Sequence, residues 1–145
     1  MTALLHRRGD GERVGGTTTV TMKATGADPG GSFHLGEVSA EPGFPDRPPH
    51  VHERQHDMFY VLEGTLTMLL GDKSTELAEG DFVCVPPGVV HTSSNPSAGR
   101  ARCLNFHTPG GWENYIRELG VALGQGTPTP EQMDAIASRH DFRAA

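Results

Sequence analysis

The feature that most constrains the fold is the regular spacing of turn-forming residues between residues 58 and 108. Short apolar or alternating runs such as "MFYVLEG", "TLTMLLGD" and "DFVCVPPG" are interrupted by Gly, Asn, Asp or Pro every eight to ten residues. Short strands bounded by turn residues are typical of an all-β sandwich or barrel. The 19 glycines and 11 prolines among 145 residues agree with this interpretation, and the length fits one domain with a buried core.

Two β-branched runs precede this region, "TTTVTMKAT" at 17–25 and "SFHLGEVSA" at 32–40, and both are predicted to be strands. Residues 1–16 end in "GDGERVGG" and are predicted to be a flexible N-terminal arm. The Pro-rich connection "EPGFPDRPP" disfavours a helix before His50. The predicted β-barrel domain therefore covers residues 17–108.

The period changes after residue 108, in "GGWENYIRELGVAL". Apolar residues there recur at the spacing of one helical stripe. They are Trp112, Tyr115, Ile116, Leu119 and Leu123. Gly124 suits the end of this helix, and Glu113 and Arg117 are predicted to pair across one turn of another face.

A second helix is predicted from "TPEQMDAIASRH". Thr129 suits the N-cap, Pro130 the first helical position and Gln132 the third, which is a capping-box pattern. Residues 109–145 are therefore predicted to form a helical extension that packs on the barrel.

Charge, hydropathy and cysteine content argue against a nucleic-acid-binding, membrane-spanning or disulfide-rich protein. A formal net charge of −6 argues against nucleic acid or an anionic membrane as a partner. No stretch approaches the length of a spanning helix, and the N-terminus lacks an apolar signal core. Cys84 and Cys103 are too few for a disulfide framework and are predicted to be buried free thiols. A soluble cytoplasmic protein is the expectation.

Histidines concentrate in "PPHVHERQHD", from Pro48 to Asp57. Alternate residues of a strand share a face, so His50 and His52 project from the same side about 7 Å apart along the backbone. Both rings can converge on one cation. The simpler alternative is two surface imidazoles on an edge strand.

A second element, "GDFVCVPPGVVHTSSN", ends a strand in a Pro-Gly turn and begins the next strand with His91. A histidine in this place could lie beside His50 and His52 on a neighbouring strand.

These two elements resemble the two motifs of the cupins. The second motif, G-x5-P-x-G-x2-H-x3-N, is matched at every position from Gly80 to Asn95, and the first, G-x5-H-x-H-x3,4-E-x6-G, is matched by His50, His52 and Gly64. The resemblance covers about residues 17–108, and the tail is similar to small monocupins of the quercetin 2,3-dioxygenase-like group. The resemblance implies an all-β fold: a double-stranded β-helix, or jelly-roll barrel, with two short C-terminal helices. It also implies a metal bound at the open end of the barrel.

The first motif departs from the family in two places. Gly43 precedes His50 by six residues where the pattern has five, and the family's glutamate is absent. Counting back six residues from Gly64 leads to Asp57, with His56 beside it. The six-residue count favours Asp57 as the fourth ligand. His56 remains an alternative ligand, or a hydrogen-bond partner of one.

The resemblance implies that His50, His52, His91 and Asp57 bind one divalent transition metal per chain. Three imidazoles and a carboxylate suit Fe, Mn, Ni, Co, Cu or Zn and disfavour Ca²⁺ or Mg²⁺. By its matched position Asp57 is also the candidate catalytic base. No other cofactor is expected.

The function implied by the resemblance is a quercetinase-like dioxygenase, an oxidoreductase that cleaves a flavonol-like or other enolisable aromatic substrate with O2. A non-oxidative metal-dependent polyketide cyclase or isomerase is one alternative, and a small-molecule binding cupin with a structural metal is another. The expected partners are a small-molecule substrate, O2 and a second copy of the chain. In such a homodimer, residues 1–25 could supply an exchanged strand.

The remaining histidines, His6, His34, His107 and His140, are predicted to be surface or core-edge imidazoles. His107 has an alternative, because it shares one strand face with Cys103 and Asn105 and could line the cavity.

Overall fold

The structure is a computed structural model and describes residues 3–16, 18–28, 31–44 and 48–145. Its strands are β1 (Glu12–Gly15), β2 (Thr19–Ala24), β3 (His34–Ala40), β4 (His50–Val51), β5 (His56–Glu63), β6 (Leu66–Leu70), β7 (Lys73–Leu77), β8 (Phe82–Val85), β9 (His91–Ser94), β10 (Ala101–Thr108) and β11 (Arg143–Ala144). Its helices are α1 (Trp112–Gly124) and α2 (Pro130–Ser138).

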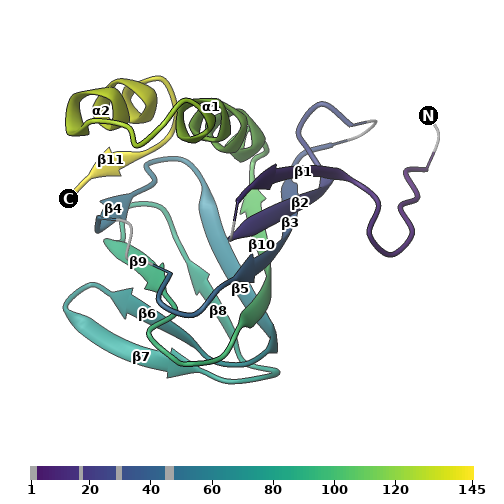
Figure 1. The fold of residues 1–145 in the computed structure, drawn as a ribbon, viewed down its shortest axis with the longest axis vertical. Coiled ribbons are helices and arrows are strands. Elements are labelled where there is room, and N and C mark those ends of the chain that lie inside the picture. The colour runs from purple at the N-terminus through teal and green to yellow at the C-terminus, as the bar shows by residue number, and fades with distance from the viewer. Residues whose placement is uncertain (1–2, 17, 29–30, 45–47) are drawn as a thin grey trace.

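The strands form two antiparallel sheets that face each other (Figure 1). One sheet has the order β1-β2-β3-β10-β5-β8 and the other β11-β4-β9-β6-β7. From β3 to β11 the chain passes back and forth between the two sheets, with only β6 and β7 consecutive in one sheet, as expected for a jelly-roll barrel. The predicted fold class, a double-stranded β-helix with two short C-terminal helices, is confirmed.

The N-terminal arm is more ordered than predicted. Strand β1 pairs with β2 from Glu12↔Met22 to Gly15↔Thr19, so the expectation of a flexible arm over 1–16 is wrong for Glu12–Gly15. The hairpin depends on Gly15, whose φ is +112° and whose position has no room for a Cβ beside the Thr18 carbonyl oxygen. Gly15, which belongs to the segment predicted to be loose, instead ends a paired strand.

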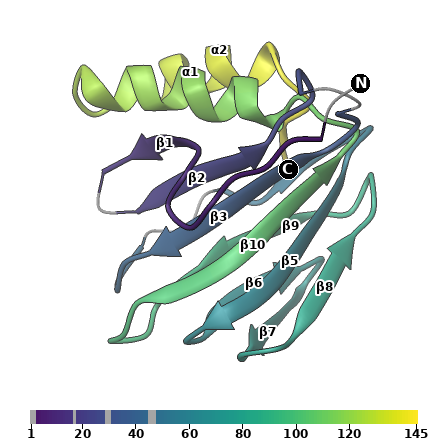
Figure 2. The ribbon, with the colours of Figure 1, turned by 90° about the vertical axis from the view of Figure 1, so that its right-hand side faces the viewer.

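Both helices lie across the same end of the barrel (Figure 2). Helix α2 begins with the predicted capping box, in which Thr129 accepts from the Gln132 amide and the Gln132 side chain accepts from the Thr129 amide. Helix α1 buries its predicted stripe except for Leu123, which is 52% exposed. The buried part joins an apolar cluster between helices and sheet, made of Met22, Trp112, Tyr115, Ile116, Leu119 and Ile136.

A second apolar cluster fills the other end of the barrel. It consists of Phe59, Val61, Leu66, Met68, Leu77 and Cys103, contributed by both sheets. Burial of each large apolar side chain contributes about 1.5–3 kcal/mol. The two clusters leave a polar layer between them, in which the candidate site lies.

Two side-chain predictions are wrong. Glu113 does not pair with Arg117, because it turns inward, is 3% exposed and accepts hydrogen bonds from the Gly26 and Gly111 amides. Arg117 binds Glu12 of β1 instead. Cys103 is a buried free thiol as predicted, whereas Cys84 is free but exposed, because it lies on the outer face of β8.

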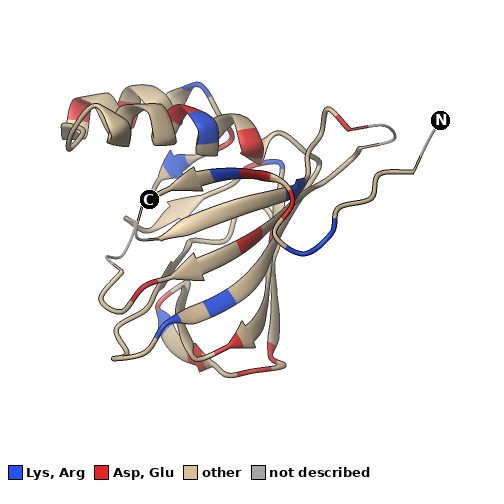
Figure 3. Ribbon diagram, turned by 45° about the vertical axis from the view of Figure 1, so that its right-hand side comes forward, with Lys and Arg blue, Asp and Glu red and all other residues tan. Residues whose placement is uncertain are grey.

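Acidic and basic side chains are interspersed over the strands and helices (Figure 3). Within the described part of the chain, neither helix is long and apolar enough to cross a membrane.

Candidate metal centre

Two short strands of one sheet carry the first two histidines. His50 begins β4 and His91 begins β9, and they are directly opposite each other in the antiparallel register. Their ring centroids are 4.5 Å apart. His52 follows β4 at once, and its ring lies 5.0 Å from that of His50 and 5.2 Å from that of His91. The three imidazoles therefore converge.

The opposite sheet supplies the carboxylate. Along β5 the side chains alternate, so Asp57 is buried on the same face as Phe59 and Val61, whereas His56 is exposed on the outer face. One possible ligand atom from each of His50, His52, Asp57 and His91 lies within 4.8 Å of the others. The structure thus brings Asp57 to the three imidazoles and leaves His56 outside the cluster.

Backbone carbonyls orient all three rings. Nδ1 of His50 bonds to the Pro48 oxygen, Nδ1 of His91 to the Val89 oxygen and Nδ1 of His52 to the Asp141 oxygen. A carbonyl oxygen can only accept, so each Nδ1 carries the proton and each Nε2 presents a lone pair. This is the arrangement in which histidines bind metals, with the second ring nitrogen fixed by a carbonyl.

With the three rings neutral, the cluster therefore contains only acceptors. The Asp57 Oδ2 atom is 2.9 Å from Nε2 of His91 and 3.4 Å from Nε2 of His52. Nε2 of His52 is buried without a hydrogen-bond partner. Lone pairs and an anion at such distances repel one another, and burial adds the cost of lost solvation. A cation between them would remove both penalties.

The spacing fits a transition metal. Two ligand atoms at about 2.1 Å from one ion are roughly 3.0 Å apart at a right angle and about 3.4 Å apart at the tetrahedral angle. The two distances from Asp57 Oδ2 agree with these values. The residues present therefore fit a metal ion.

The electrostatics also favour positive charge at this place. Burial opposes ionisation of Asp57, but the neighbouring His107, His52 and His91 hold its pKa well below the usual range. Burial likewise opposes protonation of His52, yet Asp57 raises its pKa. His50 differs, because burial and the adjacent His91 ring lower its pKa to about 3 and keep its lone pair free.

Two side chains of β10 fix the remaining oxygen of Asp57. The Asn105 amide donates to Oδ1 at 2.7 Å, and Nε2 of His107 lies 3.1 Å from the same atom. Asp57 and His107 are directly opposite in the β5–β10 register. These contacts leave Oδ2 facing the imidazoles.

The structure corrects the prediction for His34 and His107, since neither is exposed at all. Both stand in one row across three strands, His34 opposite His107 and His107 opposite Asp57. His107 therefore lines the site, which was the alternative considered for it. Sequence reasoning also missed Gln55, whose Oε1 is 3.2 Å from Nδ1 of His107. For His107, the signal available in the sequence was that it shares one strand face with Cys103 and Asn105.

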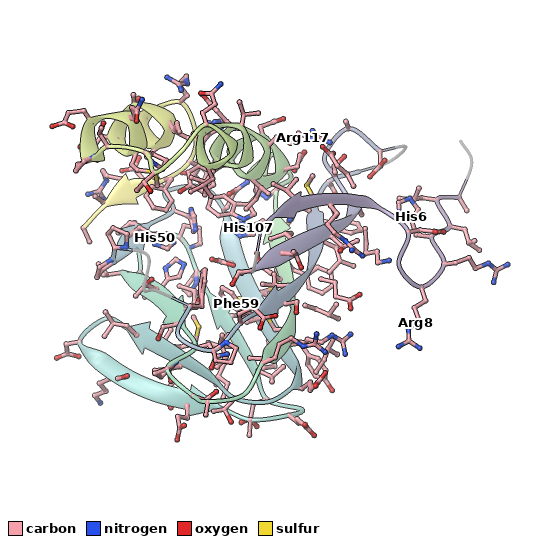
Figure 4. The ribbon with its side chains drawn as sticks, viewed as in Figure 1. His6, Arg8, His50, Phe59, His107 and Arg117 are labelled. Atoms are coloured by element: carbon pink, nitrogen blue, oxygen red, sulfur yellow. The ribbon has the colours of Figure 1, made fainter. Side chains whose placement is uncertain are left out.

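Aromatic rings cover the site. Trp112 stacks on His107 at 4.5 Å and 11°, and Phe142 stacks on His50 at 4.4 Å and 17°. Figure 4 shows His50 and His107 beneath the layer of α1, α2 and β11, with Phe59 deeper in the barrel. None of the four candidate ligands is more than 5% exposed.

The fold and the site define a class: a small antiparallel β barrel with a buried candidate metal centre of three histidines and one aspartate. The chain belongs to the cupin superfamily, since residues 36–107 match the family model of the cupin domain.

Among curated proteins, quercetin 2,3-dioxygenase from Bacillus subtilis (strain 168) is 27% identical over 142 residues, which cover 97% of this chain and 42% of the relative. The chain spans less than half of the length of the curated relatives it matches. Among solved structures, the polyketide cyclase RemF from Streptomyces resistomycificus aligns with a TM-score of 0.62 and 27% identity, over 74% of this chain and 80% of that chain. KdgF from Halomonas sp. aligns with a TM-score of 0.63, over 79% of this chain and 98% of that chain; at 18% identity this likeness concerns the fold alone.

Proposed function

We propose that the chain is a metal-dependent dioxygenase that cleaves a flavonol-like or other enolisable aromatic substrate with O2. His50, His52, His91 and Asp57 would hold one divalent transition metal, Fe, Mn, Ni, Co, Cu or Zn. The observation that carries the proposal is the buried cluster of three Nε2 lone pairs and a carboxylate within 4.8 Å of one another. A cation bound among these acceptors would offset their mutual repulsion and their lost solvation.

The protein's own residues would prepare the reaction. When bound, a divalent cation favours the deprotonated form of a substrate hydroxyl. Asp57 is the candidate base for that proton, since its Oδ2 faces the cluster and a base must reach within about 3 Å. Trp112 and Phe142 stack on His107 and His50 and would limit the access of water to the site. Similarity to quercetin 2,3-dioxygenase along nearly the whole chain supports this choice of reaction.

A non-oxidative cyclisation or isomerisation is the second candidate. Asp57 Oδ1 is engaged by Asn105 and lies next to His107, which leaves Oδ2 to act on a substrate. A bound metal acting as a Lewis acid, together with that oxygen as a base, would serve a reaction without O2 equally well. The similarity to the polyketide cyclase RemF supports this alternative.

The experiment combines metal analysis with oxygen uptake. Wild-type, Asp57→Ala and His56→Ala proteins are analysed for metal, then mixed with quercetin with and without O2. The dioxygenase proposal expects about one metal per wild-type chain, depletion in Asp57→Ala only, and O2 uptake in proportion to substrate loss. Turnover without O2 would support the cyclase or isomerase. Substrate binding without turnover would indicate a binding protein with a structural metal.

We also propose that the chain works as a homodimer. Phe82 of the edge strand β8 is 57% exposed, and Tyr60, its register partner on β5, is 40% exposed. Exposed apolar side chains on a sheet edge favour pairing with another surface. Strand β1 pairs with β2 of its own chain in this structure, so the outer face of β5 and β8 is the better candidate for the contact.

A further inference from the structure

A cavity of about 920 Å³ lies between the β1–β2 hairpin, both helices and the C-terminal segment. None of the four candidate metal ligands lines it. Its apolar wall combines buried side chains with others that stay partly exposed in the single chain: Val14, Val20, Ile116, Leu119, Leu123, Met133 and Phe142. Apolar surface left in contact with water favours an occupant that covers it.

The charged groups at this cavity disfavour an anionic occupant. Its acidic lining residues are Glu53, Asp134 and Asp141, and Arg143 is the sole arginine or lysine among the described lining residues. Arg143 is already paired with Glu53 at 2.9 Å. Asp134 is exposed on α2 and has no ion pair within the described part of the chain. The cavity therefore suits an apolar segment that carries positive charge.

The N-terminus of the chain has such a segment at residues 4–8, here called the leucine–arginine segment. Leu4 and Leu5 are 43% and 68% exposed, and the side chains of Arg7 and Arg8 are also exposed. Neither guanidinium has an ion pair among the residues that the structure describes. A single exposed leucine is common on protein surfaces, but two neighbouring leucines next to two cations match both the wall and the charge of the cavity.

A turn holds this segment away from the rest of its own chain. The Asp10 amide donates to the Arg7 carbonyl oxygen, and the Arg7 amide donates to the Asp10 carboxylate. Nζ of Lys23, on β2, donates to the carbonyl oxygens of both residues. Figure 4 shows His6 and Arg8 far from His50 and from the two helices. The leucines are thus presented to solvent by an ordered turn.

The leucine–arginine segment and the cavity lie at opposite ends of β1. The segment leads into β1 at Glu12, whereas Gly15, Gly16 and Thr18 border the cavity at the other end of the strand. No described residue before Val14 lines the cavity. Figure 1 shows the N-terminus on the opposite side of the hairpin from α2 and β11. The turn therefore keeps the two apart in one chain, and a second copy can bring them together.

We infer that the leucine–arginine segment of one copy docks in this cavity of a second copy. Leu4 and Leu5 cover the apolar wall, and Arg7 and Arg8 lie beside its acidic residues. Strand β1 stays paired with β2 of its own chain, so no strand is exchanged. Because each copy supplies one segment and one cavity, the two contacts are equivalent and close a symmetric dimer. The inference adds a contact to the proposed homodimer and is independent of the metal centre and of the reaction.

Cross-linking between two copies tests the contact directly. Leu5→Cys protein is mixed with Ala137→Cys or with Ala135→Cys protein and treated with a short bismaleimide, and all three carry Cys84→Ser to remove the exposed native thiol. Ala137 is half-buried and lines the cavity, whereas Ala135 is exposed on the same helix and does not. Mass spectrometry of the joined peptides compares the two positions. We expect position 137 to be joined to position 5 several-fold more than position 135.

Random collision would favour the exposed position 135. An equal or lower yield at position 137 would therefore overturn the inference.

Sedimentation equilibrium separates this contact from the one proposed on the outer face of β5 and β8. Leu4→Ser/Leu5→Ser removes the docking side chains, and Tyr60→Ser/Phe82→Ser is the matched variant of the other face. All four residues are exposed in the single chain, so both variants should fold, and thermal unfolding checks this. We expect Leu4→Ser/Leu5→Ser to raise the Kd of the dimer by roughly tenfold or more.

An unchanged Kd in Leu4→Ser/Leu5→Ser, or a monomeric wild type, would refute the inference. Weakening of the dimer by Tyr60→Ser/Phe82→Ser alone would leave only the β5–β8 contact. Metal content is measured on the same samples, so a metal-free chain that still dimerises through the leucines would refute the proposed function and leave this inference. The neutral apolar dye Nile red should fluoresce more strongly with Leu4→Ser/Leu5→Ser than with wild type; equal fluorescence would mean that the cavity is open to small molecules instead.

Discussion

At the scale of single residues, the position of Asp57 explains how a shorter carboxylate can stand where a glutamate is expected. Its backbone lies on β5, directly opposite His107, so the strand itself carries the side chain to the imidazoles. Asn105 then occupies Oδ1 and leaves Oδ2 toward His52 and His91. The missing methylene is offset by placement and by orientation.

This explanation predicts that Asn105 matters for metal affinity without being a ligand. Asn105→Leu removes the donor at 2.7 Å from Asp57 Oδ1 and frees the carboxylate to rotate. We expect affinity for Zn²⁺ to fall roughly 10- to 100-fold, as for other residues that orient metal ligands. Competition with a chromophoric chelator measures it. His56→Ala is the matched control, and an unchanged affinity in Asn105→Leu would show that Asp57 needs no orientation.

His34 predicts a pH dependence of stability. Burial and the nearby His107 lower its pKa to about 4 in the folded protein, whereas an unfolded histidine titrates near 6.5. Between these values the unfolded chain binds more protons, so the free energy of unfolding falls as the pH drops through this window. In His34→Gln, denaturant unfolding of chelated protein between pH 4.5 and 6 should show proton uptake reduced by about one. Equal uptake in both proteins would contradict the assignment.

Sequence alone indicated the members of the cluster but not the residues that support them. His50, His52, His91 and Asp57 lie in motifs with fixed spacing, so their convergence could be expected. His107, Asn105 and Gln55 come from places whose relation to Asp57 depends on the register of β10 against β5 and on the course of a loop. Register is a long-range property, and a shift of one residue would exchange the two faces of the strand.

At the scale of elements, the C-terminal segment acts as a clamp on the loop that carries His52. The Asp141 carboxylate accepts hydrogen bonds from the amides of Glu53, Arg54 and Gln55, and its carbonyl holds Nδ1 of His52. The loop after β4 is thus fixed by a residue almost ninety positions away.

Loss of this clamp should loosen the site without removing a ligand. In Asp141→Ala three backbone amides lose their acceptor, and we expect the loop at residues 52–55 to exchange its amide hydrogens faster. Hydrogen exchange followed by mass spectrometry measures this directly, and Zn²⁺ affinity should fall in parallel, by roughly tenfold or more. Asp134→Ala, an exposed aspartate on α2, is the control. Unchanged exchange in Asp141→Ala would mean that the loop holds its own conformation.

Local sequence patterns predict some of the helices and strands but not others. The helices were predictable because a stripe and a capping box are local signals, and β5 and β10 were predictable from apolar runs. Strands β1, β4 and β11 are short, and β4 and β11 have two residues each, too few for any periodicity. They exist because a neighbouring strand supplies hydrogen bonds. The inward position of Glu113 also depends on distant partners, because its carboxylate accepts hydrogen bonds from the Gly26 and Gly111 amides.

At the scale of the whole molecule, the candidate centre joins the two sheets. His50 and His91 belong to the five-stranded sheet, Asp57 belongs to the six-stranded sheet, and His52 is tied to the C-terminal segment. A bound metal would therefore cross-link both faces of the barrel and hold the helical extension to its mouth. Its binding free energy would add to the stability of the complete fold, because the unfolded chain lacks the site.

Removal of metal should consequently destabilise the whole molecule in one transition. With Zn²⁺ at about 100 times its Kd, the stabilisation is about 2.7 kcal/mol, and for a chain of this length Tm should fall by roughly 5–10 °C after chelation. Thermal unfolding followed by circular dichroism measures the shift, and near- and far-ultraviolet signals should change together. The double variant His50→Ala/His91→Ala should unfold at one temperature with or without Zn²⁺. If chelation shifted only a minor, separate transition, the metal would stabilise the helical extension alone, and the two sheets would be held by their apolar clusters.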